Sequence, residues 1–134
     1  MRALVDTGAL LALASTGDQH HADAARITRR HRAAGGRLVS TMLVLGEFYS
    51  HVLYARGPRP ARALLTSLLA DPAYEWMDVT SDLVTGARGW LERFHDQAFS
   101  LVNAVSFEVM RREKLTHAFA FDQHFAVAGF ELLG

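Results

Sequence analysis

The chain has 134 residues, half of them hydrophobic, and its 14 basic and 14 acidic residues give a formal net charge of zero. This length predicts a single domain, residues 1–134, with a core of its own. The neutral balance excludes a global basic field for nucleic acid or an anionic membrane, but it leaves room for a local basic groove. The absence of cysteine excludes disulfides and thiolate metal sites. The sequence shows neither a leader pattern nor an apolar run of about 18 residues, so we expect a cytoplasmic protein outside the membrane.

The N-terminal segment predicts a buried strand that ends in an acid. Three apolar residues, 3–5, run directly into Asp6. Such a short unbroken run is typical of a parallel strand that is covered on both faces, and ligands of open parallel sheets bind beyond the carboxyl ends of the strands. Asp6 is therefore a candidate site residue. An equally good alternative is that Asp6 only caps the helix that starts near Gly8.

Helices and strands alternate along the rest of the chain. We expect helices over residues 9–14, 19–34, 42–56, 60–70, 81–94 and 101–113, and strands over residues 38–39, 74–79, 118–122 and 130–133. The last of these strands alternates in hydrophobicity, which is typical of an edge. This order predicts an α/β fold, a three-layer α/β/α sandwich around a central, mainly parallel sheet of four to five strands.

Four acids are candidates for one shared site. Asp6 and Asp122 each follow an apolar strand, and such strand ends lie at the same edge of a parallel sheet. Glu47 is the only acid in an apolar helix, and Asp96 lies just before another. Carboxylates that converge repel one another and raise one another's pKa. A divalent cation relieves this repulsion, and Mg²⁺ prefers such oxygen ligands.

Glu47 has a second interpretation. A buried carboxylate is costly unless it is paired, hydrogen-bonded or bound to metal. However, Glu47, Ser50, His51 and Tyr54 are spaced by three and four residues, so that they can share one solvated face of the helix.

Four segments resemble the PIN-domain ribonucleases, in particular the VapC-type toxins of bacterial toxin–antitoxin pairs. They are residues 4–7, 45–47, 99–107 and 120–125, and the resemblance spans essentially the whole chain in the right order. It implies a small α/β/α sandwich and a Mg²⁺- or Mn²⁺-dependent endoribonuclease that cleaves structured RNA, such as tRNA or rRNA. It also implies a homodimer and a small cognate antitoxin whose C-terminal segment blocks the site.

The resemblance assigns catalytic roles residue by residue, to Asp6, Glu47, Asp96, Asn103 and Asp122. All of them except Asp96 would contribute to the metal site, and Thr7 and Ser106 would support it with their hydroxyl groups. Position 103 departs from the family, because an aspartate is expected where Asn103 stands. An asparagine offers a carbonyl oxygen without the charge, which should weaken both the metal and the activated water.

Three explanations for Asn103 compete. It can be an inactivating substitution made so that a toxic nuclease could be produced, it can mark a naturally inactive relative, or Asp96 can take over as a ligand. We favour the first. The simpler alternative is that Asn103 is only a polar residue in the first helical turn after the cap Ser100.

Other surfaces and other functions remain open from the sequence. An apolar stripe on helix 60–70 can serve an interface or pack within the monomer. Seven arginines can contact phosphates or be ordinary surface residues: Arg56, Arg59, Arg62, Arg88, Arg93, Arg111 and Arg112. A competing function is a catalytically dead PIN module that binds RNA or protein without cleaving it. A response-regulator-like phosphotransfer domain is disfavoured, because the only lysine, Lys114, follows a helix instead of the last strand.

Overall fold

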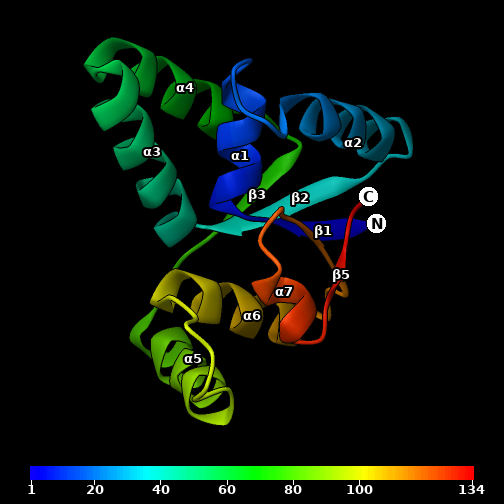
Figure 1. The fold of residues 1–134 in the computed structure, drawn as a ribbon, viewed down its shortest axis with the longest axis vertical. Coiled ribbons are helices and arrows are strands. Elements are labelled where there is room, and N and C mark those ends of the chain that lie inside the picture. Colours follow the sequence, from blue (N-terminus) through cyan, green and yellow to red (C-terminus); the bar gives the residue numbers. More distant parts are fainter.

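The computed structural model describes residues 1–134 and confirms the predicted three-layer α/β/α sandwich. In chain order its elements are β1 (Arg2–Val5), α1 (Thr7–Ala14), α2 (His21–Ala33), β2 (Arg37–Thr41), α3 (Met42–Arg56), α4 (Pro58–Ala70), β3 (Tyr74–Met77), α5 (Ser81–Arg93), α6 (Leu101–Glu113), β4 (His117–Phe119), α7 (His124–Val127) and β5 (Glu131–Leu132). Figure 1 shows α1 to α4 on one side of the sheet and α5 to α7 on the other. None of the helices has the length and hydropathy that crossing a membrane requires.

The five strands are all parallel and lie in the order β3-β2-β1-β4-β5. The chain builds outward from β1 to β3 and then returns to the other side of β1 to add β4 and β5. Strand order therefore reverses between β1 and β4, and a parallel sheet opens a ligand-binding crevice at this point, beyond the carboxyl ends of its strands. Asp6 follows the first of these two strands, and Asp122 comes after the second.

The two faces of the sheet carry separate halves of the core. Leu4 and Val39 face α5, α6 and α7, whereas Ala3, Val5 and Leu38 face α1 to α4. The last three residues of β1, Ala3, Leu4 and Val5, are fully buried, as the unbroken apolar run predicted. Because β1 is the middle strand, its carboxyl end is held by packing from both layers.

The structure differs from the sequence prediction after β4 and before α4. The strand predicted over residues 118–122 is too long: β4 ends at Phe119, and Asp122 lies in the turn that leads into α7. The Asp122 carboxylate accepts a hydrogen bond of 2.8 Å from the His124 backbone N–H, which starts this short, unpredicted helix. Helix α4 begins at Pro58, before the predicted residue 60, because Gly57 takes the preceding position with a φ of 93°.

The apolar stripe on α4 packs mainly within the monomer. Leu64 and Leu68 lie against the core half that contains α1 and α3, together with Leu53 of α3. Leu69 is the exposed member of the stripe. The homodimer that the family resemblance implies stays a prediction.

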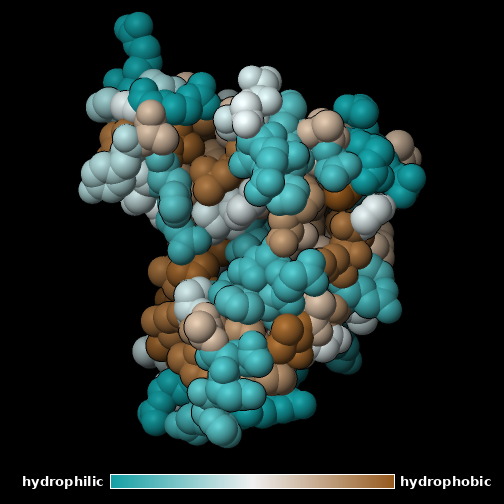
Figure 2. Space-filling model, viewed as in Figure 1, coloured by the Kyte–Doolittle hydropathy of each residue, from teal (hydrophilic) through white to brown (hydrophobic).

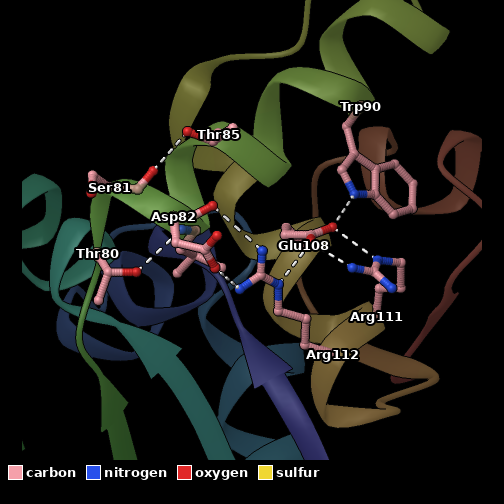
Figure 3. A network of polar contacts seen from close by, with 9 residues as sticks. Thr80, Ser81, Asp82, Thr85, Trp90, Glu108, Arg111 and Arg112 are labelled. Atoms are coloured by element: carbon pink, nitrogen blue, oxygen red, sulfur yellow. Dashed lines mark hydrogen bonds and ion pairs between the residues drawn. The ribbon is translucent and has the colours of Figure 1, made fainter.

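Helix α6 is fixed to α5 by a buried acid, Glu108, whose side chain is only 4% exposed. Its carboxylate accepts hydrogen bonds from the Trp90 indole N–H (3.0 Å), from two nitrogens of Arg111 (3.0 and 2.7 Å) and from Arg112 (2.8 Å), as Figure 3 shows. Arg112 also pairs with Asp82 at the start of α5. Arg111 and Arg112 were candidates for phosphate contacts, but in the structure both donate hydrogen bonds to Glu108.

The two helices approach closely at this cluster. A Cβ atom on Gly86 of α5 would lie 2.6 Å from a Glu108 carboxylate oxygen, so that a side chain at this position would displace the carboxylate. The bonds from Arg111, supported by those from Arg112 and Trp90, lower the pKa of Glu108 to about 2. The acid is therefore charged at neutral pH, and its stabilising effect is lost only as pH falls below 4.5 toward the lowered pKa.

Replacing Glu108 by alanine should destabilise the fold. We expect Glu108→Ala to lower the free energy of unfolding by about 2 kcal/mol, because the half-buried indole N–H of Trp90 loses its acceptor and the contact between α5 and α6 is weakened. Urea unfolding measures this change. The matched control is Glu92→Ala, which removes an acid of an exposed helical pair and should cost less than about 0.5 kcal/mol. Equal effects of the two substitutions would show that the Glu108 cluster does not stabilise the fold.

Candidate functional site

Asp6 is buried at the carboxyl end of β1, with only 6% of its surface exposed. Its backbone N–H donates to the Phe119 carbonyl at 3.1 Å, which ties it to the end of β4. Asp6 occupies the N-cap position of α1, but its side chain makes no capping hydrogen bond. It forms no ion pair either. The alternative that Asp6 only caps the helix therefore does not account for this buried carboxylate.

The surroundings of Asp6 disfavour its charged form. Burial is the main cause that raises the pKa of Asp6 to about 6, and the charges of Asp122 and Glu47 contribute to the same rise. The Thr7 backbone N–H and His124 act in the opposite direction. Asp6, Glu47 and Asp122 thus lie near enough to influence one another electrostatically, although they come from three distant parts of the chain.

Asn103 and His124 complete the polar surroundings of this edge. Asn103 is the third residue of α6 and is 7% exposed. Its side-chain oxygen lies 3.4 Å from the His124 Nδ1, and the same nitrogen lies 3.3 Å from a carboxylate oxygen of Asp122. The His124 ring packs edge-on against Phe99, which fixes its orientation. Asn103, Asp122 and His124 therefore form one contiguous group.

Asn103 also has a structural role. Its backbone N–H donates to the Ser100 hydroxyl at 3.0 Å, and its side-chain oxygen accepts from the Ser100 backbone N–H at 3.3 Å. This reciprocal pair is a capping box, which gives a partner to the backbone N–H groups of Ser100 and Asn103 at the start of α6. Asn103 is therefore a polar residue of the first helical turn, as the simpler alternative from the sequence has it. It also lies close to His124, which contacts Asp122.

Glu47 lies at the border between the acid group and solvent. It is half-buried and makes no hydrogen bond or ion pair, while Ser50, His51 and Tyr54 on the same helix are exposed. The solvated face proposed from their spacing therefore exists. Glu47 occupies its inner end, where its charge contributes to the raised pKa of Asp6.

Asp96 is not brought to this group. It is exposed in the turn between α5 and α6, and its charge is not among those that shift the pKa of Asp6. Its assignment as an additional acid of the site stays a prediction.

Two hydroxyl groups near the site are buried without a partner. Thr7 directly follows Asp6, and Ser106 lies one helical turn after Asn103. The side-chain oxygens of both make no hydrogen bond. A buried polar atom without a partner costs free energy. The supporting role that the sequence resemblance gave these two residues stays a prediction.

The oxygen donors near this edge are of the chemical type that a hard divalent cation prefers. Asp6, Glu47 and Asp122 supply carboxylates and Asn103 supplies an amide oxygen, which are ligands that suit Mg²⁺ or Mn²⁺. No group of three or more acids or histidines is placed to hold a metal by itself. The N-termini of α1, α3 and α6 all start at this edge, and in the space-filling view the molecule is indented on this side, between α3 and the pair α5 and α6 (Figures 1 and 2).

Sequence reasoning did not assign a role to His124 or Glu108. The signal for His124 was its position two residues after Asp122, a spacing at which an aspartate often accepts a backbone hydrogen bond. The signal for Glu108 was its spacing of three and four residues from Arg111 and Arg112.

The raised pKa of Asp6 predicts a pH-dependent stability in metal-free buffer. An acid with a pKa of 3.8 when unfolded and about 6 when folded stabilises the fold below the first value, and this stabilisation is lost as pH rises through the second. Between about pH 4 and pH 7, the chain should lose about 2.4 kcal/mol of unfolding free energy relative to Asp6→Asn. Urea unfolding at several pH values measures this, with Asp96→Asn as the control that keeps the normal slope. Identical pH slopes for the chain and Asp6→Asn would contradict the buried environment.

Comparison with known proteins supports the fold and identifies the family. The model of the PIN domain matches residues 3–131. The chain is 34% identical over 126 residues to the 23S rRNA-specific endonuclease VapC20 of Mycobacterium tuberculosis, covering 94% of this chain and 93% of that protein. The crystal structure of M. tuberculosis VapC20, described as a sarcin–ricin loop cleaving toxin, superimposes with a TM-score of 0.83 at 33% identity, over 97% of this chain and 96% of the other.

A more distant structure shows the same fold. VapBC2 from Rickettsia felis, bound to a DNA fragment from its promoter, matches with a TM-score of 0.71 at 12% identity, over 98% of this chain and 97% of the other. The family model and the curated relative together cover nearly the whole sequence. The chain therefore belongs to the PIN domain family and is one of its VapC-type members.

Proposed function

We propose that this protein is a metal-dependent endoribonuclease toxin that cleaves structured RNA in the cytoplasm. The observation that carries the proposal is the buried Asp6, which has two acidic neighbours and no cationic partner. Such a group is costly in an isolated protein and favourable around a divalent cation. The relative with 34% identity is named a 23S rRNA-specific endonuclease, so that the sarcin–ricin hairpin of 23S rRNA is the first substrate to test.

The residues at this edge would have different roles in such a site. Asp6, Asn103, Asp122 and Glu47 would hold Mg²⁺ or Mn²⁺ through oxygen atoms, with Asp6 as the buried ligand and Glu47 on the solvent side. When bound, the cation would supply Lewis-acid stabilisation of the phosphodiester and lower the pKa of an attacking water. Thr7 and Ser106 would use their free hydroxyl groups to orient the neighbouring ligands.

Asn103 leaves this site one negative charge short. Its amide oxygen still faces the group, where it lies close to His124, but it cannot balance a dication as a carboxylate does. The chain with Asn103 should therefore be a weak or inactive nuclease, whichever origin the substitution has.

A second candidate function rests on the same residue. A PIN module that binds RNA or protein without cleaving it would not need the missing charge. It would retain the capping box at Ser100, which is satisfied by Asn103 as it stands. This alternative predicts that restoring an acid at position 103 creates no nuclease.

The proposal includes partners as well as a substrate. One solved structure of similar fold is a toxin–antitoxin complex from Klebsiella pneumoniae. By analogy we propose that this toxin pairs with a small antitoxin that covers the acidic edge, and that it forms a homodimer.

Restoring the acid should restore cleavage. We expect Asn103→Asp to bind Mn²⁺ at least about tenfold more tightly than the chain with Asn103, because it regains one ligand charge. It should also cleave the sarcin–ricin hairpin, whereas the chain with Asn103 cleaves slowly or not at all. Calorimetric metal titration and gel analysis of the RNA measure the two effects, and removal of the metal with EDTA should abolish cleavage.

Two further variants make this result specific. Adding Asp6→Asn to Asn103→Asp should abolish cleavage again, while adding Asp96→Asn tests the predicted extra acid separately. If Asn103→Asp folds and still neither binds Mn²⁺ nor cleaves RNA, the dead-module alternative replaces the nuclease.

A further inference from the structure

An aromatic stack leads from the core to the surface beside the acidic edge. Phe119, at the end of β4, is buried and packs edge-on against Phe121, with ring centroids 6.1 Å apart. Phe121 in turn lies parallel to His20, with centroids 4.3 Å apart and an angle of 4° between the planes. Phe121 directly precedes Asp122 in the segment that joins β4 to α7.

His20 is the outer member of the stack. It lies in the turn between α1 and α2, and both His20 and Phe121 are half-buried. Phe121 is anchored by its contact with the core half formed with α1 to α4. One face of the His20 ring is covered by Phe121, and His20 as a whole is partly accessible to solvent.

The turn that carries His20 is held in place from both sides. The His20 backbone N–H donates to the Asp18 carboxylate at 2.8 Å, and the ring of the next residue, His21, contacts the Ala12 carbonyl through Nδ1 at 2.7 Å. A ring that is already oriented loses little conformational freedom when a further planar group stacks on it.

We propose that His20, supported by Phe121, is a stacking platform for an unpaired base of the RNA beside the scissile phosphate. This inference rests on the proposed endoribonuclease function. Proteins that recognise RNA loops stack splayed-out bases on aromatic or histidine rings, and such contacts tolerate any base because each base has a π face. Stacking here would place the adjacent phosphate toward Asp122 and its neighbours. His20 would thus fix which position of the RNA loop enters the site, independently of the base that stands there.

Binding can be tested with the chain as it is, because Asn103 should keep cleavage slow. The probe is the sarcin–ricin hairpin with 2-aminopurine replacing each loop purine in turn, whose fluorescence is quenched when the base stacks on an aromatic ring. We expect quenching at one loop position, and His20→Ala should remove that quenching and weaken binding roughly tenfold. His20→Phe should retain both properties, which separates stacking from any change in folding.

His51→Ala is the matched control, because His51 is an exposed histidine on α3 and should leave binding and quenching unchanged. If His20→Ala binds and quenches like the parent while Asn103→Asp cleaves the hairpin, the platform is refuted and the nuclease function stands. If Asn103→Asp neither binds nor cleaves the RNA, both are refuted. Loss of quenching in His20→Phe as well as in His20→Ala would also contradict stacking as the cause.

Discussion

The burial of one carboxyl group, that of Asp6, is the constraint on which the functional edge depends. Packing from both layers fixes the end of β1, and a hydrogen bond from the Asp6 backbone to Phe119 joins it to the end of β4. The side chain is thereby withdrawn from water next to two other acids, and its pKa rises to about 6. An isolated fold gains nothing from this arrangement. A site for a divalent cation uses it directly, because the cation replaces both the lost water and the missing counter-charge.

Topology explains why residues so distant in sequence meet there. The reversal of strand order between β1 and β4 brings Asp6 and Asp122 to the carboxyl ends of two neighbouring strands, where open parallel sheets bind their ligands. The helices that follow β1 and β2, together with α6, present their N-termini to the same edge, and the positive ends of their dipoles offset part of the acidic charge. Glu108 contributes from a distance, because its bonds to Trp90, Arg111 and Arg112 hold α6, and therefore Asn103, against α5.

Much of this fold is predictable from local patterns. The apolar run that ends in Asp6, the cap at Ser100 and the alternation of strands and helices all reflect short-range chemistry, and the structure agrees with them. Helix α7 has only four residues, too few for a periodic pattern. The burial of Glu108 depends on Gly86 and Trp90 of another helix, and the stack of His20 on Phe121 joins two distant turns. Such features come from tertiary packing: the spacing of Glu108 from Arg111 and Arg112 indicates an ion pair, but it carries no signal for burial against another helix.

The central claim is that Asp6 belongs to a cation site, and the pKa of its carboxyl group reports on this directly. Carbon-13 NMR titration of the Asp6 side chain, with assignment by Asp6→Asn, should give a pKa of about 6 in EDTA. In saturating Mg²⁺ that pKa should fall below the ordinary value for aspartate, because the cation favours the carboxylate. An ordinary pKa in EDTA that Mg²⁺ leaves unchanged would contradict the account.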